Sequence, residues 1–388
     1  MKLLILTSRV PWPLDKGDRL RIYHQIRYLS ESHDIELVAI SADKNNEAAY
    51  NELSKYCSKI HFLNISATEN AIGVLKSFFT NKPLQIGYFY NSSVKKQFLE
   101  ILKASNPDYV YGQLIRVAEY MQGIDIPTVL DLQDAFSKGL QRRAQMAKGP
   151  FKWILNMEYK RMLAYEQNEL SSFNGLSIIT NADRLLLPEN IQKRTAIVPN
   201  GVDFDFFKPQ KSVKKYNVVF TGNMSYAPNV MAAEFLIKEI MPLVWSHNAQ
   251  ITVLLAGSTP HNKVLALASD RVVVSGWLND IRDAYAQSSI FVAPMQIGTG
   301  LQNKLLEAMA MELPCITSDL ANMALKASGG NDILIGDNND ANSYAGHIIQ
   351  LLNDADYSNN LAKKGNVFVK QNFDWKSAVD KLELLFVK

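Results

Sequence analysis

Cysteine and long apolar runs are both scarce in this chain of 388 residues. Cys57 and Cys315 are its only cysteines, and two such distant thiols exclude a disulfide framework and indicate a reducing compartment. No apolar run approaches the roughly 18 residues of a membrane-spanning helix. The first run, Leu3–Leu6, is too short for a signal-peptide core. The sequence therefore predicts a cytoplasmic protein, either free or peripheral on the inner face of the cytoplasmic membrane.

A strong charge of one sign is also missing, since the formal net charge is +3 at pH 7. This excess is too small to indicate nucleic acid as a partner. Lys and Arg nevertheless outnumber Asp and Glu by 5 in residues 1–200, and fall short of them by 2 in the remainder. A basic first half is suited to phosphates or an anionic lipid surface, although solvated surface charge is the simpler explanation.

Residues that commonly bind metals form no cluster. The 6 histidines are scattered, and none lies in a His/Cys pattern that would predict zinc. Asp203 and Asp205 form an Asp-x-Asp pattern, which can hold Mg²⁺. They lie in a Pro/Gly/Lys-rich linker rather than at a strand end, so we expect no metal and no cofactor.

The order of the elements indicates an α/β protein of two domains. A chain of this length exceeds the size at which one hydrophobic core stops growing. Continuous apolar runs alternate with helical patterns in both halves, which is typical of parallel strands covered by helices. The expected strands cover residues 3–7, 35–40, 60–63, 109–111, 128–132, 176–180 and 196–198, then 217–221, 251–256, 271–274, 290–293 and 314–316. The main expected helices cover residues 18–30, 93–103, 137–171, 229–245, 281–287 and 303–311.

The Pro/Gly/Lys-rich stretch at residues 199–212 is the best candidate for a linker. We therefore predict two Rossmann-like, doubly wound domains, 1–205 and 206–370, which face an interdomain cleft. An amphipathic helix within 371–388 is expected to pack back on the first domain.

In the first domain, two loops follow predicted strands and could form a site. The first holds Lys16 and Gly17 before a helix, where a close backbone and positive charge favour phosphate; the alternative is an ordinary capped loop. The second holds Gln133 and Asp134, which could bind sugar hydroxyls or an acceptor, or cap a helix. The following segment, 138–161, interleaves basic and aromatic residues and suits either an anionic membrane surface or a core-packed helix.

In the second domain, glycines again follow strands. Gly222 and Asn223 end one strand before a helix, and Gly276 and Trp277 end another, where backbone groups could meet a nucleobase. Either pattern is common in Rossmann domains and is weak alone.

The strongest motif is the segment Gly298–Glu307, between a strand and a helix. Its glycines expose N–H groups at a helix start, where a diphosphate gains from hydrogen bonds and from the helix dipole. Lys304 lies in the first turn, near that anion. Glu307 follows one turn later, where its carboxylate could bind ribose hydroxyls.

Taken together, these motifs resemble the family 4 glycosyltransferases, which are retaining sugar transferases of GT-B fold. The resemblance covers the whole chain, and Val219–Met224 with Gly300–Lys304 is most similar to a bacterial exopolysaccharide-associated branch. The motifs are the Gly17 loop, Val198–Asp203, Phe220–Asn223, Gly276–Trp277 and Leu306–Ala310.

The chain departs from this family at three places. The family has two glutamates separated by seven residues, whereas this chain has Thr299 and then Glu307. The family carries Arg and Lys after the strand-end glycine, whereas this chain has Asn223 and Ser225. A family histidine in the first domain is replaced by Gln133. The resemblance implies that the family's first glutamate, which is Thr299 here, contacts the donor sugar. The identity of the donor sugar therefore stays open.

The resemblance implies metal-independent, retaining transfer of a hexose-type sugar from a nucleoside diphosphate sugar to a glycan or lipid-linked hydroxyl in bacterial polysaccharide or glycoconjugate synthesis. UDP is preferred over GDP, and an inner-membrane surface is a candidate partner. The alternatives are a GT-B sugar-nucleotide epimerase and a non-catalytic nucleotide-sugar-binding relative. The residues expected to act in transfer are Gln133, Asp134 and Lys304, and those expected to bind the donor are Lys16, Gly17, Gly222, Asn223, Gly276, Trp277, Thr299, Gly300, Leu301, Asn303 and Glu307.

Overall fold

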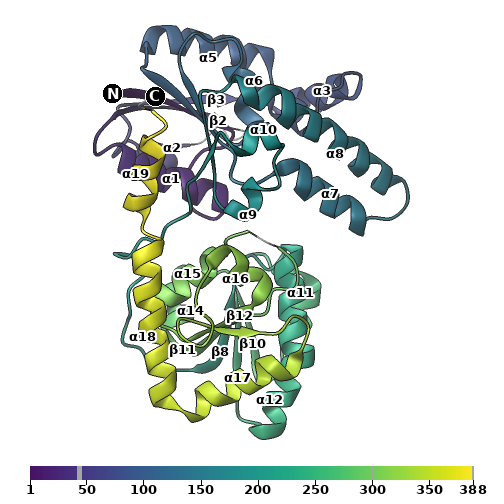
Figure 1. Cartoon of the computed structure of the whole chain (residues 1–388), viewed down its shortest axis with the longest axis vertical. Helices are drawn as coiled ribbons and strands as arrows, with labels where there is room; N and C mark the ends of the chain where they lie inside the picture. The colour runs from purple at the N-terminus through teal and green to yellow at the C-terminus, as the bar shows by residue number, and fades with distance from the viewer. Residues whose placement is uncertain (42–45, 299, 387–388) are drawn as a thin grey trace. The chain divides into compact units, whose positions relative to one another are not determined.

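A computed structural model describes residues 1–41, 46–298 and 300–386. The chain forms two compact units (Figure 1). Unit 1 consists of Met1–Pro199 together with Trp375–Lys388, and unit 2 consists of Asn200–Asp374.

Unit 1 is built on a seven-stranded sheet in the order β3-β2-β1-β4-β5-β6-β7, in which neighbouring strands are parallel. The order reverses between β1 and β4, which is the switch point of a doubly wound sheet. The central strands are apolar and buried because helices cover both faces. The strands are β1 (Lys2–Thr7), β2 (Asp34–Ser41), β3 (Lys59–Asn64), β4 (Tyr109–Gln113), β5 (Thr128–Asp131), β6 (Gly175–Ile178) and β7 (Thr195–Ile197).

The helices of unit 1 include an antiparallel pair that the sequence had suggested as one helix over 137–171. Ala147 and Lys148 have extended backbone, and Gly149 has a φ of +61°. Pro150 explains the break, because proline disfavours helical geometry in the residue before it. The helices are α1 (Gly17–Leu29), α2 (Glu47–Leu53), α3 (Ala67–Phe78), α4 (Leu84–Phe89), α5 (Ser92–Ser105), α6 (Ala118–Met121), α7 (Phe136–Met146), α8 (Gly149–Glu169), α9 (Asn181–Arg184), α10 (Glu189–Gln192) and α19 (Trp375–Glu383), with 3₁₀ turns at Ile115–Val117 and Leu170–Ser172.

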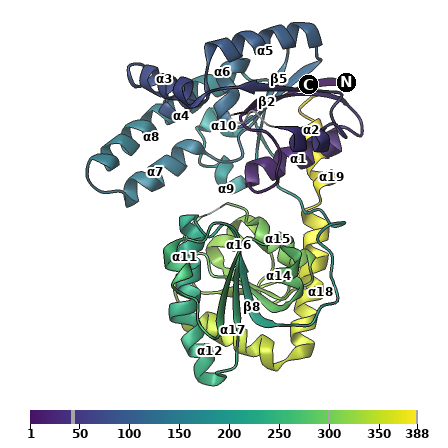
Figure 2. The same cartoon turned by 180° about the vertical axis from the view of Figure 1, so that it is seen from behind.

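The last helix, α19, packs on the core of unit 1, and Figure 2 shows it beside α1 from behind. Trp375 is 1% exposed, and its ring stacks on His24 with 4.9 Å between centroids. Residues 200–205, which the sequence had assigned to the first domain, lie in unit 2 instead. The reason is local: Val202 is buried in the second core, and its N–H donates to the Phe373 carbonyl at 2.8 Å.

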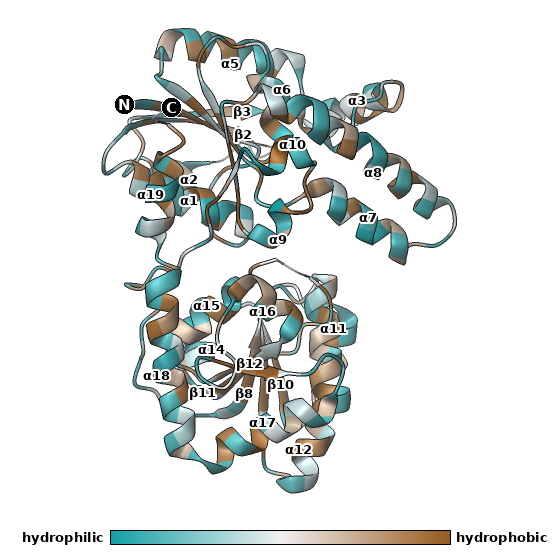
Figure 3. Ribbon diagram, viewed as in Figure 1, coloured by the Kyte–Doolittle hydropathy of each residue, from teal (hydrophilic) through white to brown (hydrophobic). Residues whose placement is uncertain are grey.

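Unit 2 has a six-stranded sheet in the order β10-β9-β8-β11-β12-β13, again with parallel neighbours. Its switch point lies between β8 and β11. Figure 3 shows hydrophobic residues along the strands of this sheet, which form the core of the unit. The strands are β8 (Tyr216–Thr221), β9 (Val253–Ala256), β10 (Val272–Gly276), β11 (Ser288–Ala293), β12 (Cys315–Ser318) and β13 (Leu334–Gly336).

Most strands of unit 2 follow the sequence prediction, but β13 and the two helices of this unit that follow it were not anticipated. The helix expected over 229–245 is continuous through a π turn at Leu236–Ile240. The helices are α11 (Ala227–Phe235), α12 (Met241–His247), α13 (Asn262–Leu265), α14 (Arg282–Ala286), α15 (Asn303–Ala310), α16 (Asp319–Leu325), α17 (Ala341–Asn353) and α18 (Ala355–Asn372).

Candidate functional site

The carboxyl ends of β8, β9, β10 and β11 meet at one edge of the unit 2 sheet, beside its switch point. Two backbone segments come very close there. A Cβ atom on Gly257, which follows β9, would lie 1.7 Å from the carbonyl oxygen of Gly222, which follows β8. A Cβ on Gly222 would lie 2.7 Å from the Asn229 amide nitrogen and 3.3 Å from the Lys304 amine. The glycine-lined edge therefore lies directly against the lysine singled out by sequence.

Helix α15 presents Lys304 and Glu307 on the same face. Leu305, Leu306, Ala308 and Met309 are buried in the core, so the two charged residues, three positions apart, share the opposite side of the helix. This amphipathic pattern places an amine and a carboxylate together beside the ends of β8 and β11.

The Lys304 amine is enclosed by protein groups. It donates a hydrogen bond to the Asn229 side-chain oxygen, lies 3.9 Å from the Met295 sulfur, and lies over the Phe220 ring at 4.7 Å from its centroid. Burial lowers the pKa of Lys304 to about 7, while the charge of Glu307 opposes this shift. An anion at this position would favour the charged amine.

Glu307 is held by a residue that the sequence analysis missed. The Tyr285 hydroxyl, on α14, donates to Glu307 Oε2 at 2.8 Å and also lies 2.9 Å from the Thr221 hydroxyl. Burial raises the pKa of Glu307, and the Tyr285 hydrogen bond and the Lys304 charge act in the opposite direction. Within the described part of the chain, Oε1 of Glu307 accepts no hydrogen bond, so one carboxylate oxygen is available for a ligand.

The start of α15 also has unused donors. Gln302 precedes the helix and its amide donates to the Gly300 carbonyl at 3.0 Å, but among the described residues no side chain caps the helix. Gly298 has a φ of +99°, which favours glycine, and Asn303 accepts a hydrogen bond from Asn200 at 3.0 Å. The first-turn N–H groups can therefore bind an anion. Leu301 packs on the core of unit 2, and Thr299 lies outside the described residues.

Asn223, Gly276 and Trp277, the other residues of unit 2 predicted to bind the donor, lie in different surroundings: Asn223 is hydrogen-bonded in a turn, whereas the other two face solvent. The Asn223 side-chain oxygen accepts from the Ser225 N–H at 2.9 Å and from its hydroxyl at 2.7 Å, which shapes the turn after β8. Gly276 has a φ of +65° and faces open space, and the Trp277 side chain that follows it is 63% exposed. Trp277 is thus an accessible aromatic surface at the end of β10.

In unit 1, the loop after β1 is held by ion pairs. Gly17 is the first residue of α1 and faces open space, next to the exposed Lys16. Arg9 contacts Asp18 at 2.8 Å, and Arg116 lies 3.8 Å from the same carboxylate. The charges gathered by this loop are therefore partly neutralised within the unit.

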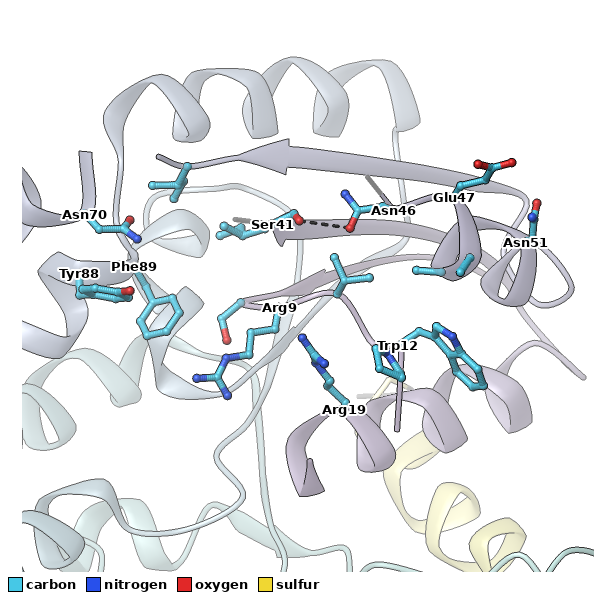
Figure 4. A pocket seen from close by; sticks show the side chains of 17 residues that line it. Arg9, Trp12, Arg19, Ser41, Asn46, Glu47, Asn51, Asn70, Tyr88 and Phe89 are labelled. Carbon is cyan, nitrogen blue, oxygen red and sulfur yellow. Dashed lines mark hydrogen bonds between the residues drawn. The ribbon is translucent and has the colours of Figure 1, made fainter. Parts of the chain in front are cut away.

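A pocket of about 640 Å³ opens beside this loop (Figure 4). Arg9 and Arg19 contribute cationic groups, and Trp12, Tyr88 and Phe89 contribute aromatic surface. Sequence reasoning missed most of the lining, because it comes from β2, α2, α3 and α4, which are distant along the chain. The other lining residues are Ser8, Val10, Pro13, Ile40, Ser41, Asn46, Glu47, Ala48, Ala49, Asn51, Ile65 and Asn70.

Gln133 and Asp134 follow β5 at the same edge of the unit 1 sheet. Gln133 has a φ of +65°, and its amide nitrogen is buried without a partner among the described residues. The pKa of Asp134 is raised to about 6, because surrounding protein displaces water and Asp183 adds negative charge, while Arg116 lowers it. The residue still reaches the surface, so this desolvation is partial.

The neighbouring Asp131 has a structural role. It is fully buried and bound by Arg21 through two hydrogen bonds of 2.7 and 2.8 Å, and the Ser177 hydroxyl donates to it at 2.7 Å. A carboxylate so satisfied is unavailable to a ligand, so Asp134 is the functional candidate of the pair.

No group of three or more potential metal-ligating His, Cys, Asp or Glu residues occurs in the described ranges. The Asp203 carboxylate instead accepts hydrogen bonds from the N–H groups of Asp205 and Phe206, at 3.1 and 3.2 Å. The Asp-x-Asp pattern thus shapes a turn. No described helix is long and apolar enough to cross a membrane.

Two Rossmann-like units with parallel sheets define the GT-B fold, and solved structures of that fold resemble this chain. Sucrose-phosphate synthase of Thermosynechococcus elongatus has a TM-score of 0.73 at 16% identity, over 100% of this chain and 98% of that chain. Anabaena HepE in complex with UDP-glucose has a TM-score of 0.69 at 14% identity, over 99% of both chains.

Sequence comparisons identify the catalytic class. Residues 215–354 match the family model described as "Glycosyl transferases group 1". An uncharacterized 44.6 kDa protein of the Klebsiella pneumoniae cps region is 22% identical over 97% of both chains. The Escherichia coli UDP-Gal:alpha-D-GlcNAc-diphosphoundecaprenol alpha-1,3-galactosyltransferase is 23% identical over 50% of this chain and 54% of its own. The chain is a glycosyltransferase of the GT-B type.

Proposed function

We propose that this enzyme transfers a hexose-type sugar from a nucleoside diphosphate sugar, UDP being preferred, to a glycan or lipid-linked hydroxyl, with retention of configuration and without a metal. The acceptor belongs to bacterial polysaccharide or glycoconjugate synthesis. The observation that carries the proposal is the Lys304–Glu307 pair on α15, beside an uncapped helix start at the switch point of unit 2.

The donor's nucleotide would occupy this edge of unit 2. Glu307, oriented by Tyr285, would accept hydrogen bonds from the ribose hydroxyls through its available oxygen. The N–H groups of Gly300 and Asn303 at the start of α15 would bind the diphosphate together with Lys304. Gly222 and Gly276 would let the backbone approach the ligand, and Trp277 would offer a surface for the base.

The chemistry needs charge stabilisation more than a protein nucleophile. As the bond between the sugar and the diphosphate breaks, negative charge builds on the leaving phosphate, where Lys304 and the helix start would stabilise it. The acceptor oxygen bonds to the anomeric carbon on the same face, and a leaving phosphate oxygen takes the acceptor proton. Configuration is thereby retained, and the product is a nucleoside diphosphate.

The acceptor would be bound by unit 1. The pocket of Figure 4 combines aromatic walls with Arg9 and Arg19, which suits a saccharide that carries a phosphate. Gln133 has an unpartnered amide and Asp134 a carboxylate, and both would bind acceptor hydroxyl groups.

The relatives support the choice of donor and acceptor. HepE has been solved with UDP and with UDP-glucose, and the Escherichia coli relative is named for UDP-Gal and a diphosphoundecaprenol-linked acceptor. The Klebsiella relative lies in a cps region. A UDP-sugar and a lipid-linked saccharide are therefore the first substrates to test.

The decisive experiment supplies UDP-sugars with a short-chain polyprenyl diphosphate saccharide and measures UDP release and the anomeric configuration of the product by NMR. We expect an α-linked product from an α-linked donor, at the same rate in EDTA. Loss of activity in EDTA with recovery in Mn²⁺ would contradict metal independence, and an inverted product would contradict retention. Free epimerised donor, or binding without turnover, would favour the epimerase or the non-catalytic alternative.

A further inference from the structure

Helix α3 turns its large apolar side chains to solvent. Ile72, Leu75 and Phe78 recur at three-residue intervals, and they are 52%, 60% and 48% exposed, while Phe79 just beyond the helix is 80% exposed. Amphipathic helices of globular proteins normally bury such a face. An uncovered apolar stripe of this kind marks an interaction surface.

The inner face of α3 explains this orientation. A Cβ atom on Gly73 would lie 2.1 Å from the Gly87 carbonyl oxygen, and one on Gly87 would lie 1.9 Å from the Ser77 hydroxyl. Helices α3 and α4 thus pack through small residues at a distance that admits no larger side chain. Rotating α3 to bury its apolar stripe would break this contact, so the stripe stays outside.

A second apolar group lies at the turn between α7 and α8. Met146, Phe151 and Trp153 are 64%, 55% and 64% exposed. Figures 1 and 2 show α3 alongside α8. The end of α3 contacts the middle of α8, because the Arg161 guanidinium donates to the carbonyl oxygens of Ser77 and Phe78 at 3.1 and 3.2 Å.

The charge of the α7–α8 segment is almost entirely positive, whereas α3 carries Glu69 in its first turn and Lys76 in its last. Segment 138–161 contains seven basic residues and one acidic residue, Glu158, which is buried. At the α7–α8 turn, exposed Lys148 precedes Phe151, and exposed Lys152 lies between Phe151 and Trp153 in the sequence. Lys76 is exposed within α3. Aromatic wedges surrounded by cations complement an anionic bilayer, where apolar groups enter the headgroup region and cations meet phosphates.

We propose that α3 and the α7–α8 turn form one lipid-docking surface, which binds the surface of an anionic phospholipid bilayer. Ile72, Leu75, Phe78 and Phe79 insert among the headgroups. At the α7–α8 turn, Trp153 inserts as well, and Lys148 and Lys152 contact the lipid phosphates. This inference goes beyond the transfer reaction, since it concerns adhesion to lipid whatever the substrates are. A lipid-linked acceptor, if the proposed function holds, would then be met at the membrane.

The test is co-sedimentation of the full chain with vesicles of phosphatidylcholine alone or mixed with phosphatidylglycerol. We expect binding to the anionic vesicles that weakens as salt rises. Leu75→Ser combined with Phe79→Ser should reduce the partition coefficient at least about tenfold. The matched control, Leu185→Ser, changes another exposed apolar residue of unit 1 and should bind as wild type.

The charge contribution is tested separately. Lys148→Glu with Lys152→Glu should lower binding at low salt by about tenfold, whereas Lys96→Glu with Lys103→Glu, on exposed positions of α5, should not. Quenching of tryptophan fluorescence by brominated lipid should disappear in Trp153→Phe.

Three outcomes would overturn the proposal. The proposal fails if the wild-type protein does not bind anionic vesicles. It also fails if both double variants bind these vesicles as well as the wild type does. A dimer in lipid-free sedimentation that the α3 variant abolishes would identify the stripe as a contact between two copies instead. UDP binding measured without vesicles keeps these outcomes separate from failure of the proposed function.

Discussion

Donor binding should take up protons, because Lys304 is close to half charged at neutral pH in the free protein. Its pKa of about 7 reflects an amine enclosed by Asn229, Met295 and Phe220. A diphosphate beside that amine favours the charged form, which returns the pKa towards its usual value. Affinity for UDP should then depend on the fraction of free protein that already carries the charge.

The magnitude follows from that pKa. The charged fraction of Lys304 falls from about one half at pH 7 to about one tenth at pH 8, so UDP affinity should fall about fivefold between them. The second ionisation of a terminal phosphate has a pKa of about 6, so UDP is mostly ionised over this range. Calorimetry at pH 8 in two buffers of different ionisation enthalpy should report uptake of about 0.9 protons per UDP bound.

Matched variants isolate the source of the effect. Lys304→Arg keeps a permanent charge, so its UDP affinity should be flat between pH 7 and pH 8. Lys363→Ala, on an exposed position of α18, should keep the wild-type pH dependence. Wild-type protein with flat affinity and no proton uptake would falsify the reasoning, because Lys304 would then not meet the diphosphate from an enclosed, largely neutral state.

Three further changes test other contacts. Tyr285→Phe removes the hydrogen bond that orients Glu307 and should weaken UDP binding about tenfold in calorimetry; an unchanged dissociation constant would argue against the ribose assignment. Gly257→Ala places a Cβ against backbone at positive φ and should cost about 2 kcal/mol or more in denaturant unfolding, so an unchanged midpoint would contradict that close approach. Asp134 should lose its carboxylate as pH falls through about 6, so kcat/KM should decline below that pH. Asp134→Asn should lower the plateau about tenfold or more and abolish that acid limb, and an acid limb that persists would assign it elsewhere.

The arrangement of the residues proposed to bind the donor could be largely predicted from the sequence because its geometry is local. Gly222 and Gly276 directly follow strands, and Lys304 and Glu307 lie three residues apart on one helix. In a parallel sheet the strand ends meet at one edge, so such residues are brought together by the fold class alone. Tyr285 could not be anticipated, since its contact with Glu307 depends on how α14 packs beside β8 and β11.

The pocket proposed to bind the acceptor could hardly be predicted from the sequence. The pocket of unit 1 joins Arg9 with Tyr88 and other residues that lie far apart in the chain, and no pattern links them. Gln133 and Asp134 were predicted as site residues because they follow a strand. Sequence analysis selected Asp134 but gave no role to its neighbour Asp131, because only the tertiary structure pairs Asp131 with Arg21.

The sequence by itself determined the class of this protein: alternating apolar runs and helical patterns specify two doubly wound units, and the segment Gly298–Glu307 predicts a helix start suited to an anion. Tertiary structure alone decided which partners the charged groups have and which surfaces stay open. It encloses Lys304, orients Glu307 through Tyr285, and leaves the apolar stripe of α3 in solvent. The physical reason is that periodicity follows from backbone geometry, whereas burial and pairing depend on contacts between residues distant in sequence.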